Sequence, residues 1–306
     1  MSEDGSRGGG PGNRPSESGA MSPTPPAAML GKYGLAPSRQ RGQNFLSDAN
    51  VIRKVVSAVG LSPDDVVVEI GPGFGALTFA LAQAARHVVA VEIDAGIAGA
   101  FRAEYGERED ITLVVGDILD LGFAEVAEHH GVDKLVVVGN IPYNITSPLV
   151  RRLTDERDHV ARCLLMIQSE VGARIASEPG ESDYSGLSVV MRYHARVRRL
   201  FTVKRTCFYP RPKVDSGVIE IVFERDLGRR SDPDTFEAVV HAAFGKRRKM
   251  LRQSLRVMMS ERGKTASELE EVTGIALSRR GETLSVEEFD DLACALVGDG
   301  QGGARV

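Results

Sequence analysis

The chain has few of the features that mark secreted, metal-binding or membrane proteins. It holds three cysteines in 306 residues, and Cys163, Cys207 and Cys294 have neither the number nor the spacing of a disulfide framework or a metal site. We interpret them as reduced thiols. No apolar run approaches the roughly 20 residues that span a bilayer, and the first residues lack a signal-peptide pattern. We therefore expect a cytoplasmic protein with no membrane partner and no metal.

A net charge of −4 does not suggest a nucleic-acid-binding protein, but the charge is unevenly distributed. Between Arg192 and Arg256 there are 17 Lys and Arg residues and 7 Asp and Glu residues, a local excess of +10 that leaves −14 for the rest of the chain. Such asymmetry indicates a polyanion-binding face on an acidic protein. A solvated surface of salt bridges would give the same count, so charge alone leaves both interpretations open.

The middle of the chain alternates between two kinds of hydrophobic pattern. Continuous apolar runs predict strands buried on both faces, and the segments between them have helical periodicity. The predicted strands are Val66–Ile70, His87–Val91, Ile111–Val115, Leu135–Val138 and Cys163–Ile167, with Arg199–Val203 and Val218–Phe223 as closing antiparallel strands; the predicted helices are Ser47–Val59, Leu77–Ala84, Ala95–Tyr105, Phe123–His129 and one beginning at Pro148–Leu153. This alternation predicts an α/β fold with a Rossmann-like, mainly parallel sheet over residues 31–226.

The two ends of the chain differ from this pattern. Residues 1–30 are rich in Gly, Pro and Ser, and we predict a disordered tail. A small all-helical domain is predicted over residues 227–298, followed by a flexible tail over 299–306. Its signals are Asp232-Pro233 as a helix start, helical periodicity at Ala238–Phe244 and Leu251–Met258, and a capping box at Ser285–Glu288 that opens a last helix to about Val297.

Three consecutive strand ends carry groups that suit a nucleoside. The first predicted strand runs into Glu69-Ile70-Gly71-Pro72-Gly73-Phe74-Gly75, where Gly71 and Gly73 allow a close approach of the backbone to a ligand. Glu92 ends the second strand, where an acid can accept both ribose hydroxyls, and Asp117 follows the third, where it can accept from an adenine amino group. A glycine-rich turn without ligand and a dinucleotide site are alternatives. The combination favours S-adenosylmethionine over NAD, because none of these groups is suited to bind a phosphate.

The fourth strand ends in Asn140-Ile141-Pro142-Tyr143, a pattern suited to activating a planar amine. An adenine amino nitrogen is a poor nucleophile because its lone pair is delocalised into the ring. The Asn140 side-chain oxygen and the Ile141 carbonyl could accept its two N–H groups and turn the lone pair toward a methyl donor, with Pro142 holding the turn rigid. Tyr143 would stack on the base, and Phe208 could cover its other face. Methylation of a protein glutamine poses the same problem and is an alternative substrate.

A base inside a helix cannot reach such a pocket, so a nucleic-acid substrate must present it looped out or flipped. Basic residues near both predicted lobes could hold the phosphates and make binding salt-sensitive. These candidate RNA-binding residues are Arg205, Arg211, Lys213, Lys246, Arg247, Arg248, Lys249 and Arg252.

Four segments together resemble the rRNA adenine N6-dimethyltransferase family: Gly42–Leu46, Glu69–Gly73, Gly139–Ile145 and Phe208–Ser216. The resemblance runs from about Lys32 to Leu296, and Phe244–Leu255 is most similar to the bacterial small-subunit (16S) branch. It implies a class I S-adenosylmethionine-dependent methyltransferase that dimethylates two adjacent adenosines in a hairpin loop near the 3′ end of small-subunit rRNA, within the immature 30S particle. It also implies cofactor contacts from Asn44, Leu46, Gly71, Glu92, Asp117 and Asn140. We expect a monomer.

Departures from the family pattern are mild. Ile141 stands where the family often has Leu, and Thr146-Ser147 reverses the usual order of a small hydroxyl pair. The alternatives are the large-subunit (23S) branch of macrolide-resistance methyltransferases, which shares the cofactor and Asn-x-Pro-Tyr motifs, and a non-catalytic ribosome-assembly or transcription factor that retains the fold. Intact Glu92, Asp117, Asn140 and Tyr143 argue against the latter, and the basic C-terminal segment argues against a protein substrate.

Overall fold

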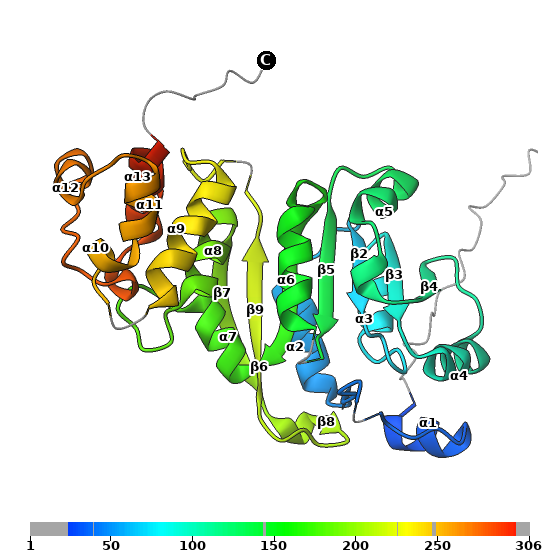
Figure 1. Ribbon diagram of the computed structural model, residues 1–306. Helices are drawn as coiled ribbons and strands as arrows, with labels where there is room; N and C mark the ends of the chain where they lie inside the picture. Colours follow the sequence, from blue (N-terminus) through cyan, green and yellow to red (C-terminus); the bar gives the residue numbers. More distant parts are fainter. Residues whose placement is uncertain (1–23, 39, 143–144, 225, 247–248, 298–306) are drawn as a thin grey trace, which may run out of the picture.

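A seven-stranded sheet forms the centre of the computed structural model, which describes residues 24–38, 40–142, 145–224, 226–246 and 249–297 (Figure 1). The strand order is β4-β3-β2-β5-β6-β9-β7. The first five of these strands run parallel, and β9 and β7 close the sheet in antiparallel pairing, as predicted. The strands are β2 (Val66–Ile70), β3 (His87–Glu92), β4 (Ile111–Val115), β5 (Leu135–Asn140), β6 (Val160–Gln168), β7 (Arg196–Val203) and β9 (Ser216–Val222).

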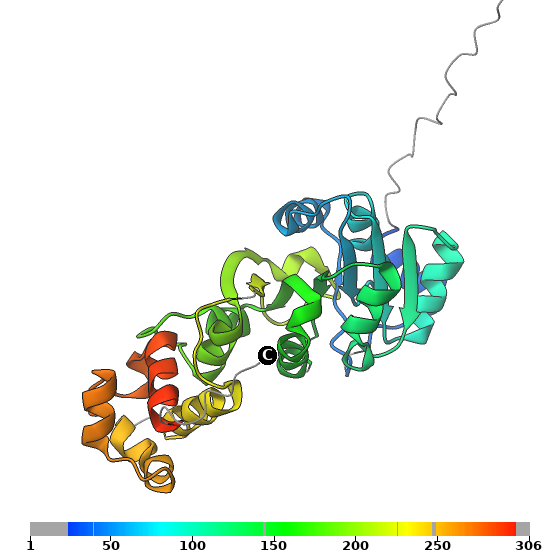
Figure 2. The same ribbon diagram turned by 90° about the horizontal axis from the view of Figure 1, so that it is seen from above.

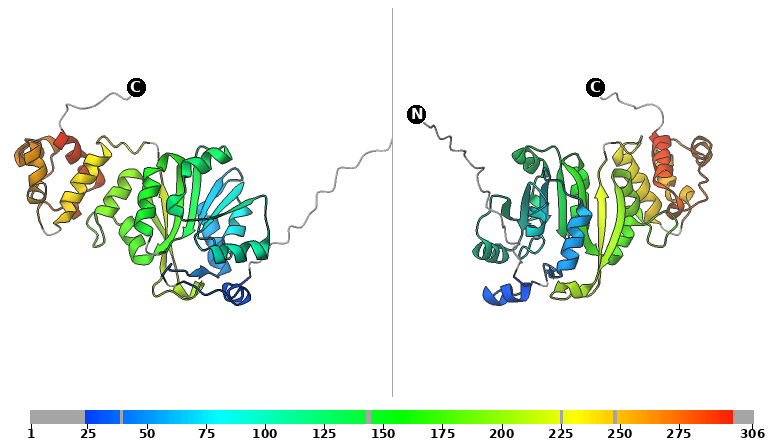
Figure 3. Two further views of the ribbon diagram at one scale, coloured as in Figure 1. Left: turned by 45° about the vertical axis from the view of Figure 1, so that its right-hand side comes forward. Right: turned by 180° about the vertical axis from the view of Figure 1, so that it is seen from behind.

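Helices cover both faces of the sheet, which explains why its central strands β2, β3 and β5 are buried along almost their whole length. In β2, Val66 and Val68 belong to the core that also includes side chains of α5 (Phe123–His130), α6 (Thr146–Asp155), α7 (Ser169–Ala176) and α8 (Gly186–His194). Val67 belongs to the opposite core, with α2 (Ala49–Val59), α3 (Thr78–Ala82) and α4 (Ala95–Tyr105). Figure 1 shows the face of the sheet that α6 covers, and the right-hand view of Figure 3 shows α2 on the opposite face. The predicted Rossmann-like α/β fold is confirmed.

The first helix corrects the predicted tail. Residues 1–23 lie outside the described residues, but α1 (Pro26–Lys32) is helical, so the prediction of a disordered segment up to residue 30 was wrong. Met29 and Leu30 are buried against Phe74, Ile97 and Ala100. The sequence holds too few apolar residues here for a core of its own, and α1 is instead stabilised by apolar side chains of the glycine loop and α4.

The C-terminal lobe is helical, as predicted, and extends beyond β7 at one end of the molecule (Figure 2). Its helices are α9 (Pro233–Gly245), α10 (Leu251–Ser254), α11 (Arg256–Glu261), α12 (Ala266–Thr273) and α13 (Val286–Val297). Asp232 caps α9, and the capping box of α13 is formed between Ser285 and Glu288. The predicted helix over Leu251–Met258 is interrupted, because the Ser254 hydroxyl bonds back to the carbonyls of Met250 and Leu251 and bends the chain.

Helix α8 joins the two lobes. Met191 packs under the sheet, whereas Val189 and Tyr193, on other sides of the same helix, are buried in the C-terminal core beside Phe236. The sequence prediction had assigned no helix here, nor at α7 or α12. One helix therefore contributes to two hydrophobic cores.

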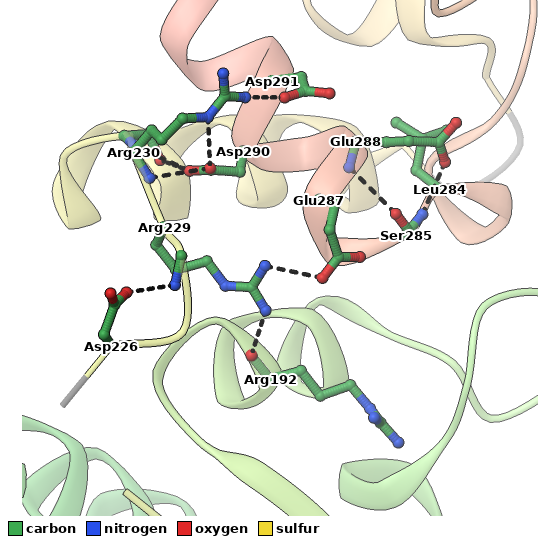
Figure 4. Close-up of polar contacts among 12 residues, drawn as sticks. Arg192, Asp226, Arg229, Arg230, Leu284, Ser285, Glu287, Glu288, Asp290 and Asp291 are labelled. Carbon is green, nitrogen blue, oxygen red and sulfur yellow. Dashed lines mark hydrogen bonds and ion pairs between the residues drawn. The ribbon is translucent and has the colours of Figure 1, made fainter. Parts of the chain in front are cut away.

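The linker between the lobes is held in place by polar contacts (Figure 4). The buried carboxylate of Asp290 on α13 accepts hydrogen bonds from the backbone of Arg230 and Ser231, both at 3.0 Å. Arg229 donates to Glu287 at 2.8 Å and to the Arg192 carbonyl of α8 at 3.2 Å. The C-terminal lobe is thereby attached to the sheet through both side chains and main chain.

The carboxyl ends of the parallel strands meet along one edge, below which α1 and the two-residue strand β8 (Phe208–Tyr209) lie in Figure 1. Strand β8 pairs with another short strand, β1 (Phe45–Leu46). This edge is where open α/β sheets bind ligands. Among the described residues, no helix combines the length and the hydropathy that a membrane crossing requires.

Candidate active site

A cavity opens at the carboxyl edge of the sheet. Its walls come from β2, β3, β5, β8 and the segment before β1, which are far apart in sequence. The lining includes nine of the predicted site residues: Asn44, Gly71, Gly73, Glu92, Asp117, Asn140, Ile141, Pro142 and Phe208. A concave site with apolar walls and a few converging polar groups is typical of the sites that bind small molecules.

Leu46 is placed differently from the other predicted cofactor residues. Its side chain is buried in the core beneath the sheet and lines a smaller adjoining hollow rather than the main cavity. The contact of Leu46 with the cofactor remains a prediction. Tyr143 lies outside the described residues.

Glu92 is fixed at the end of β3 by the backbone around it. Its two carboxylate oxygens accept from Gly73 N at 3.2 Å and from Asp94 N at 2.9 Å, and the side chain is only 5% exposed. Burial raises the pKa of Glu92, although the two backbone hydrogen bonds oppose the shift. Each oxygen keeps a second lone pair, so the carboxylate can still accept hydroxyl groups from a ligand.

Gly73 is required at its position by two independent constraints. Its φ is +55°, and a Cβ there would lie 2.7 Å from Cδ1 of Phe45. The Phe45 ring also packs against Phe74, with 4.8 Å between ring centroids. The glycine loop and the segment before β1 therefore form one close-packed wall.

One carboxylate oxygen of Asp117 has a structural role, and the other remains available to a ligand. Its Oδ1 accepts from Leu119 N at 2.9 Å and begins the short 3₁₀ helix Ile118–Asp120. No hydrogen bond within the described residues uses Oδ2. The exposed side chain of Ile93 lines the same part of the cavity and supplies an apolar surface for a flat ring. Ile93 is not among the predicted site residues, although it directly follows Glu92.

Asn140 is held in one orientation by a residue far away in sequence. Its Nδ2 donates to the main-chain carbonyl of Asn44 at 2.7 Å. Because a carbonyl can only accept, the amide must direct its nitrogen to Asn44, which leaves Oδ1 as a free acceptor. Ile141 N donates to Met166 O at 2.8 Å, and the Ile141 carbonyl accepts no hydrogen bond within the described residues. Two acceptors at the end of β5 are thus available.

Glu69 is a buried acid at the start of the glycine motif for which the sequence predicts no role. It is 2% exposed, lines the smaller hollow beside Asn140, and has an Oε2 with no hydrogen-bond partner among the described residues. Burial raises its pKa to about 8, and the nearby Glu92 adds to the shift. The hydroxyl of Thr78 opposes the shift but makes no hydrogen bond of normal geometry. An unpaired buried carboxyl of this kind suits a cationic ligand group.

The cavity provides no free cation for a phosphate. Arg41 is the sole Arg or Lys in its described lining, and this guanidinium forms an ion pair with Asp94. In the glycine turn, the Gly73 N–H that could bind a phosphate already donates to the Glu92 carboxylate. The geometry therefore favours the predicted S-adenosylmethionine over a dinucleotide.

Among the described Lys and Arg residues between Arg192 and Arg256, some form ion pairs and others do not. Carboxylates within 4.0 Å neutralise one set: Arg192, Arg196, Arg198, Lys204, Arg229 and Arg230. The salt-bridged interpretation of the charge pattern holds for these. Arg247 and Arg248 lie outside the described residues. The other predicted RNA-binding residues are exposed and have no ion pair among the described residues: Arg205, Arg211 and Lys213 near β8, and Lys246, Lys249 and Arg252 at the junction of α9 and α10.

Comparison with known proteins gives a consistent result. A family model described as ribosomal RNA adenine dimethylase matches residues 37–292. The "Ribosomal RNA small subunit methyltransferase A" of Moorella thermoacetica is 41% identical over 276 residues, covering 88% of this chain and 96% of its own length. The protein of the same name from Streptomyces avermitilis is 39% identical over 295 residues, covering 89% and 96%.

Two solved structures share the fold. A dimethyladenosine transferase from Plasmodium falciparum superposes with a TM-score of 0.68 at 23% identity, covering 81% of this chain and 95% of the other. The 23S rRNA methyltransferase ErmE superposes with a TM-score of 0.67 at 26% identity, covering 83% and 99%. Both comparisons extend over the sheet and beyond it into the C-terminal part.

Proposed function

The chain belongs to the ribosomal RNA adenine dimethylase family, and from this we propose that it dimethylates N6 of two adjacent adenosines in the 3′-terminal hairpin loop of 16S rRNA during small-subunit assembly. It is an S-adenosylmethionine-dependent rRNA adenine dimethyltransferase. The observation that carries the specific proposal is the fixed amide of Asn140, which offers Oδ1 as an acceptor in the wall of the cavity.

The cofactor fits the donor and acceptor set of the cavity. Glu92 would accept the ribose hydroxyls, the free oxygen of Asp117 the adenine amino group, and Ile93 would pack on the adenine ring. The unpartnered oxygen of Glu69 would accept from the ammonium of the methionine part. Gly71 and Gly73 admit the ligand close to the backbone. When bound, S-adenosylmethionine supplies a methyl group on a positively charged sulfur, which needs no metal for its activation.

The chain's own contribution to the reaction is placement. Asn140 Oδ1 and the Ile141 carbonyl would accept the two N–H groups of the target adenine and favour a pyramidal nitrogen whose lone pair is free to attack. Pro142 restricts the turn that holds both acceptors. Phe208, 5% exposed and in the cavity wall, would stack on the base, with Tyr143 on its other face. The two acceptors remain available after the first transfer, which is compatible with a second methylation.

We assign recognition of the RNA to Lys and Arg residues of both lobes. Arg205, Arg211 and Lys213 lie beside β8, which carries Phe208, so phosphates bound there would flank the flipped base. Lys246, Arg247, Arg248, Lys249 and Arg252 would hold a second stretch of RNA from the C-terminal lobe. We propose that the lobe over residues 227–298 binds the immature 30S particle, that residues 31–226 carry out catalysis, and that the enzyme acts as a monomer.

The relatives favour the small subunit over the large one. Those at 37–41% identity are named for the small subunit, whereas the large-subunit enzyme ErmE is 26% identical. The test is methyl transfer from labelled S-adenosylmethionine to immature small subunits, large subunits and free rRNA, with the modified nucleoside identified by mass spectrometry. We expect N6,N6-dimethyladenosine at two adjacent positions of small-subunit rRNA. Modification confined to 23S rRNA, or to a protein glutamine, would refute the proposal.

A further inference from the structure

The segment that precedes α2 crosses the carboxyl edge of the sheet and forms one wall of the cofactor cavity. We call residues 24–38 and 40–46 the N-terminal strap. Arg41, Gly42, Gln43, Asn44 and Phe45 of the strap line the cavity. The strap is attached to helix α4 at two separate carboxylates, Glu104 and Asp94.

The first attachment is Glu104, near the end of α4. Its carboxylate accepts from the Tyr33 hydroxyl at 2.9 Å and from Thr24 Oγ1 at 3.1 Å, and it forms an ion pair with Lys32. The adjacent Tyr105 hydroxyl accepts from Thr24 N at 3.2 Å. Three side chains from both ends of α1 therefore converge on one acid, in addition to the apolar contacts of Met29 and Leu30.

The second attachment is Asp94, the residue that caps the other end of α4. Its Oδ1 accepts from the backbone of Gly96 and Ile97 and so begins the helix. Its Oδ2 is left for the strap, where it pairs with Arg41 and accepts from Gln43 Nε2 at 3.2 Å. Asp94 also donates its own N–H to Glu92 at 2.9 Å, which connects this attachment to the proposed ribose acceptor.

The strap carries groups that the reaction requires. The Asn44 carbonyl orients Asn140, and the Phe45 ring closes against Gly73. Strand β1 of the strap pairs with β8, so that Leu46 lies opposite Phe208. If the strap lifts from α4, the cavity wall, the Asn140 amide and the strand carrying Phe208 lose their support together.

We propose that Asp94 and Glu104 are positioning residues that hold the N-terminal strap closed, and that this closure couples retention of the cofactor to the orientation of Asn140. Neither Asp94 nor Glu104 is among the described residues that line the cavity, so neither would contact the reacting atoms. Both act through the strap. The part of this inference that concerns Asn140 rests on the proposed function, whereas the part that concerns the cofactor does not.

The test uses the full chain and S-adenosylhomocysteine, without RNA. Asp94→Asn removes the charge that holds Arg41 but keeps a residue that caps helices well, so α4 should remain intact. Glu104→Gln removes the charge at the other attachment. Glu107→Gln is the matched control, since Glu107 follows α4 and has no ion pair among the described residues. We measure the dissociation rate of S-adenosylhomocysteine and backbone hydrogen exchange over residues 40–46.

We expect each of the two variants to release S-adenosylhomocysteine roughly 2- to 5-fold faster than wild type, as for loss of one partly exposed ion pair. Exchange should rise over residues 40–46 while the strands of the sheet remain protected, and Glu107→Gln should match wild type. Combining Asp94→Asn with Arg41→Gln should add little to either change alone, because both remove the same contact. Wild-type release rates with unchanged exchange in both Asp94→Asn and Glu104→Gln would overturn the proposal.

The coupling has its own readout in methyl transfer to immature small subunits. At saturating S-adenosylmethionine, Asp94→Asn should still show a lower kcat, because a looser strap leaves the Asn140 amide free to turn. A raised KM for the cofactor with wild-type kcat would overturn the coupling. Failure of the wild-type enzyme to methylate small-subunit rRNA would instead contradict the proposed function and leave the binding result as it stands.

Discussion

The Nδ2 of Asn140 donates a 2.7 Å hydrogen bond to the main-chain carbonyl of Asn44, a residue 96 positions earlier in the chain. This contact joins the end of β5 to the strap over the cofactor cavity. It selects one of the two possible orientations of a side-chain amide, because only the nitrogen can donate to a carbonyl. The side-chain oxygen that the proposed mechanism needs is thereby presented by the fold before any substrate arrives.

A substitution at Gly73 should weaken cofactor binding. Gly73→Ala places a Cβ against the Phe45 ring at a φ of +55°, which costs on the order of 1–3 kcal/mol and displaces the strap or the glycine loop. We expect a raised Kd for S-adenosylmethionine by isothermal calorimetry. Gly99→Ala is the matched control: Gly99 lies in α4 with open space around it, and the change should stabilise the protein by about 0.5–1 kcal/mol. Equal cofactor affinity in both variants would contradict the tight fit at Gly73.

Stability should depend on pH through Glu69. The carboxyl titrates near 4.5 in an unfolded chain and at about 8 in the folded protein, where burial raises its pKa. Between these values the folded state holds a proton that the unfolded state has released, so the free energy of unfolding falls as pH rises from about 5 to 8. Glu69→Gln stays neutral throughout. Urea unfolding at several pH values should therefore show the variant gaining stability relative to wild type across this window. A constant difference would show that Glu69 is already ionised.

Unpaired and paired cations should differ in their effect on RNA binding. Lys213→Ala removes an exposed cation without an ion pair among the described residues, and it should lower the salt dependence of binding by about one phosphate contact. Arg196→Ala removes a cation that pairs with Glu224 at 3.0 Å and should have little effect. Affinity for immature small subunits, measured over a range of salt concentrations, compares the two variants. The same loss in both would mean that the RNA is held by the overall charge of the region.

The residues at the strand ends were predictable because they follow from local pattern. A buried parallel strand is recognisable in the sequence as a continuous apolar run. Because parallel strands end at the same edge of the sheet, the sequence predicts that Glu92, Asp117 and Asn140 lie close together. Their meeting in one cavity follows from strand order alone. The chemistry of the Asn-x-Pro-Tyr motif could be read from its residue types.

The contacts that hold the site in place could not be predicted in this way. Helix α1 has no amphipathic pattern of its own and depends on α4 for its apolar contacts. The pairing of Arg196 with Glu224, or of Lys32 with Glu104, needs the folded geometry, since composition counts charges without placing them. Residues joined across long stretches of chain, such as Asn44 and Asn140, leave no local signal in either segment.

The most direct test of the account is the single-turnover rate of methyl transfer in Asn140→Ala, measured on immature small subunits with saturating cofactor. Loss of the oriented acceptor should slow transfer by at least about 10²-fold, the scale for removing one preorganised hydrogen bond at a reacting centre. Asn50→Ala, on the exposed side of α2, should transfer at the wild-type rate and serves as the control. All three proteins should unfold cooperatively, with the midpoint of Asn140→Ala lowered modestly by loss of the hydrogen bond to Asn44. Wild-type turnover in Asn140→Ala would contradict the central role given to this side chain.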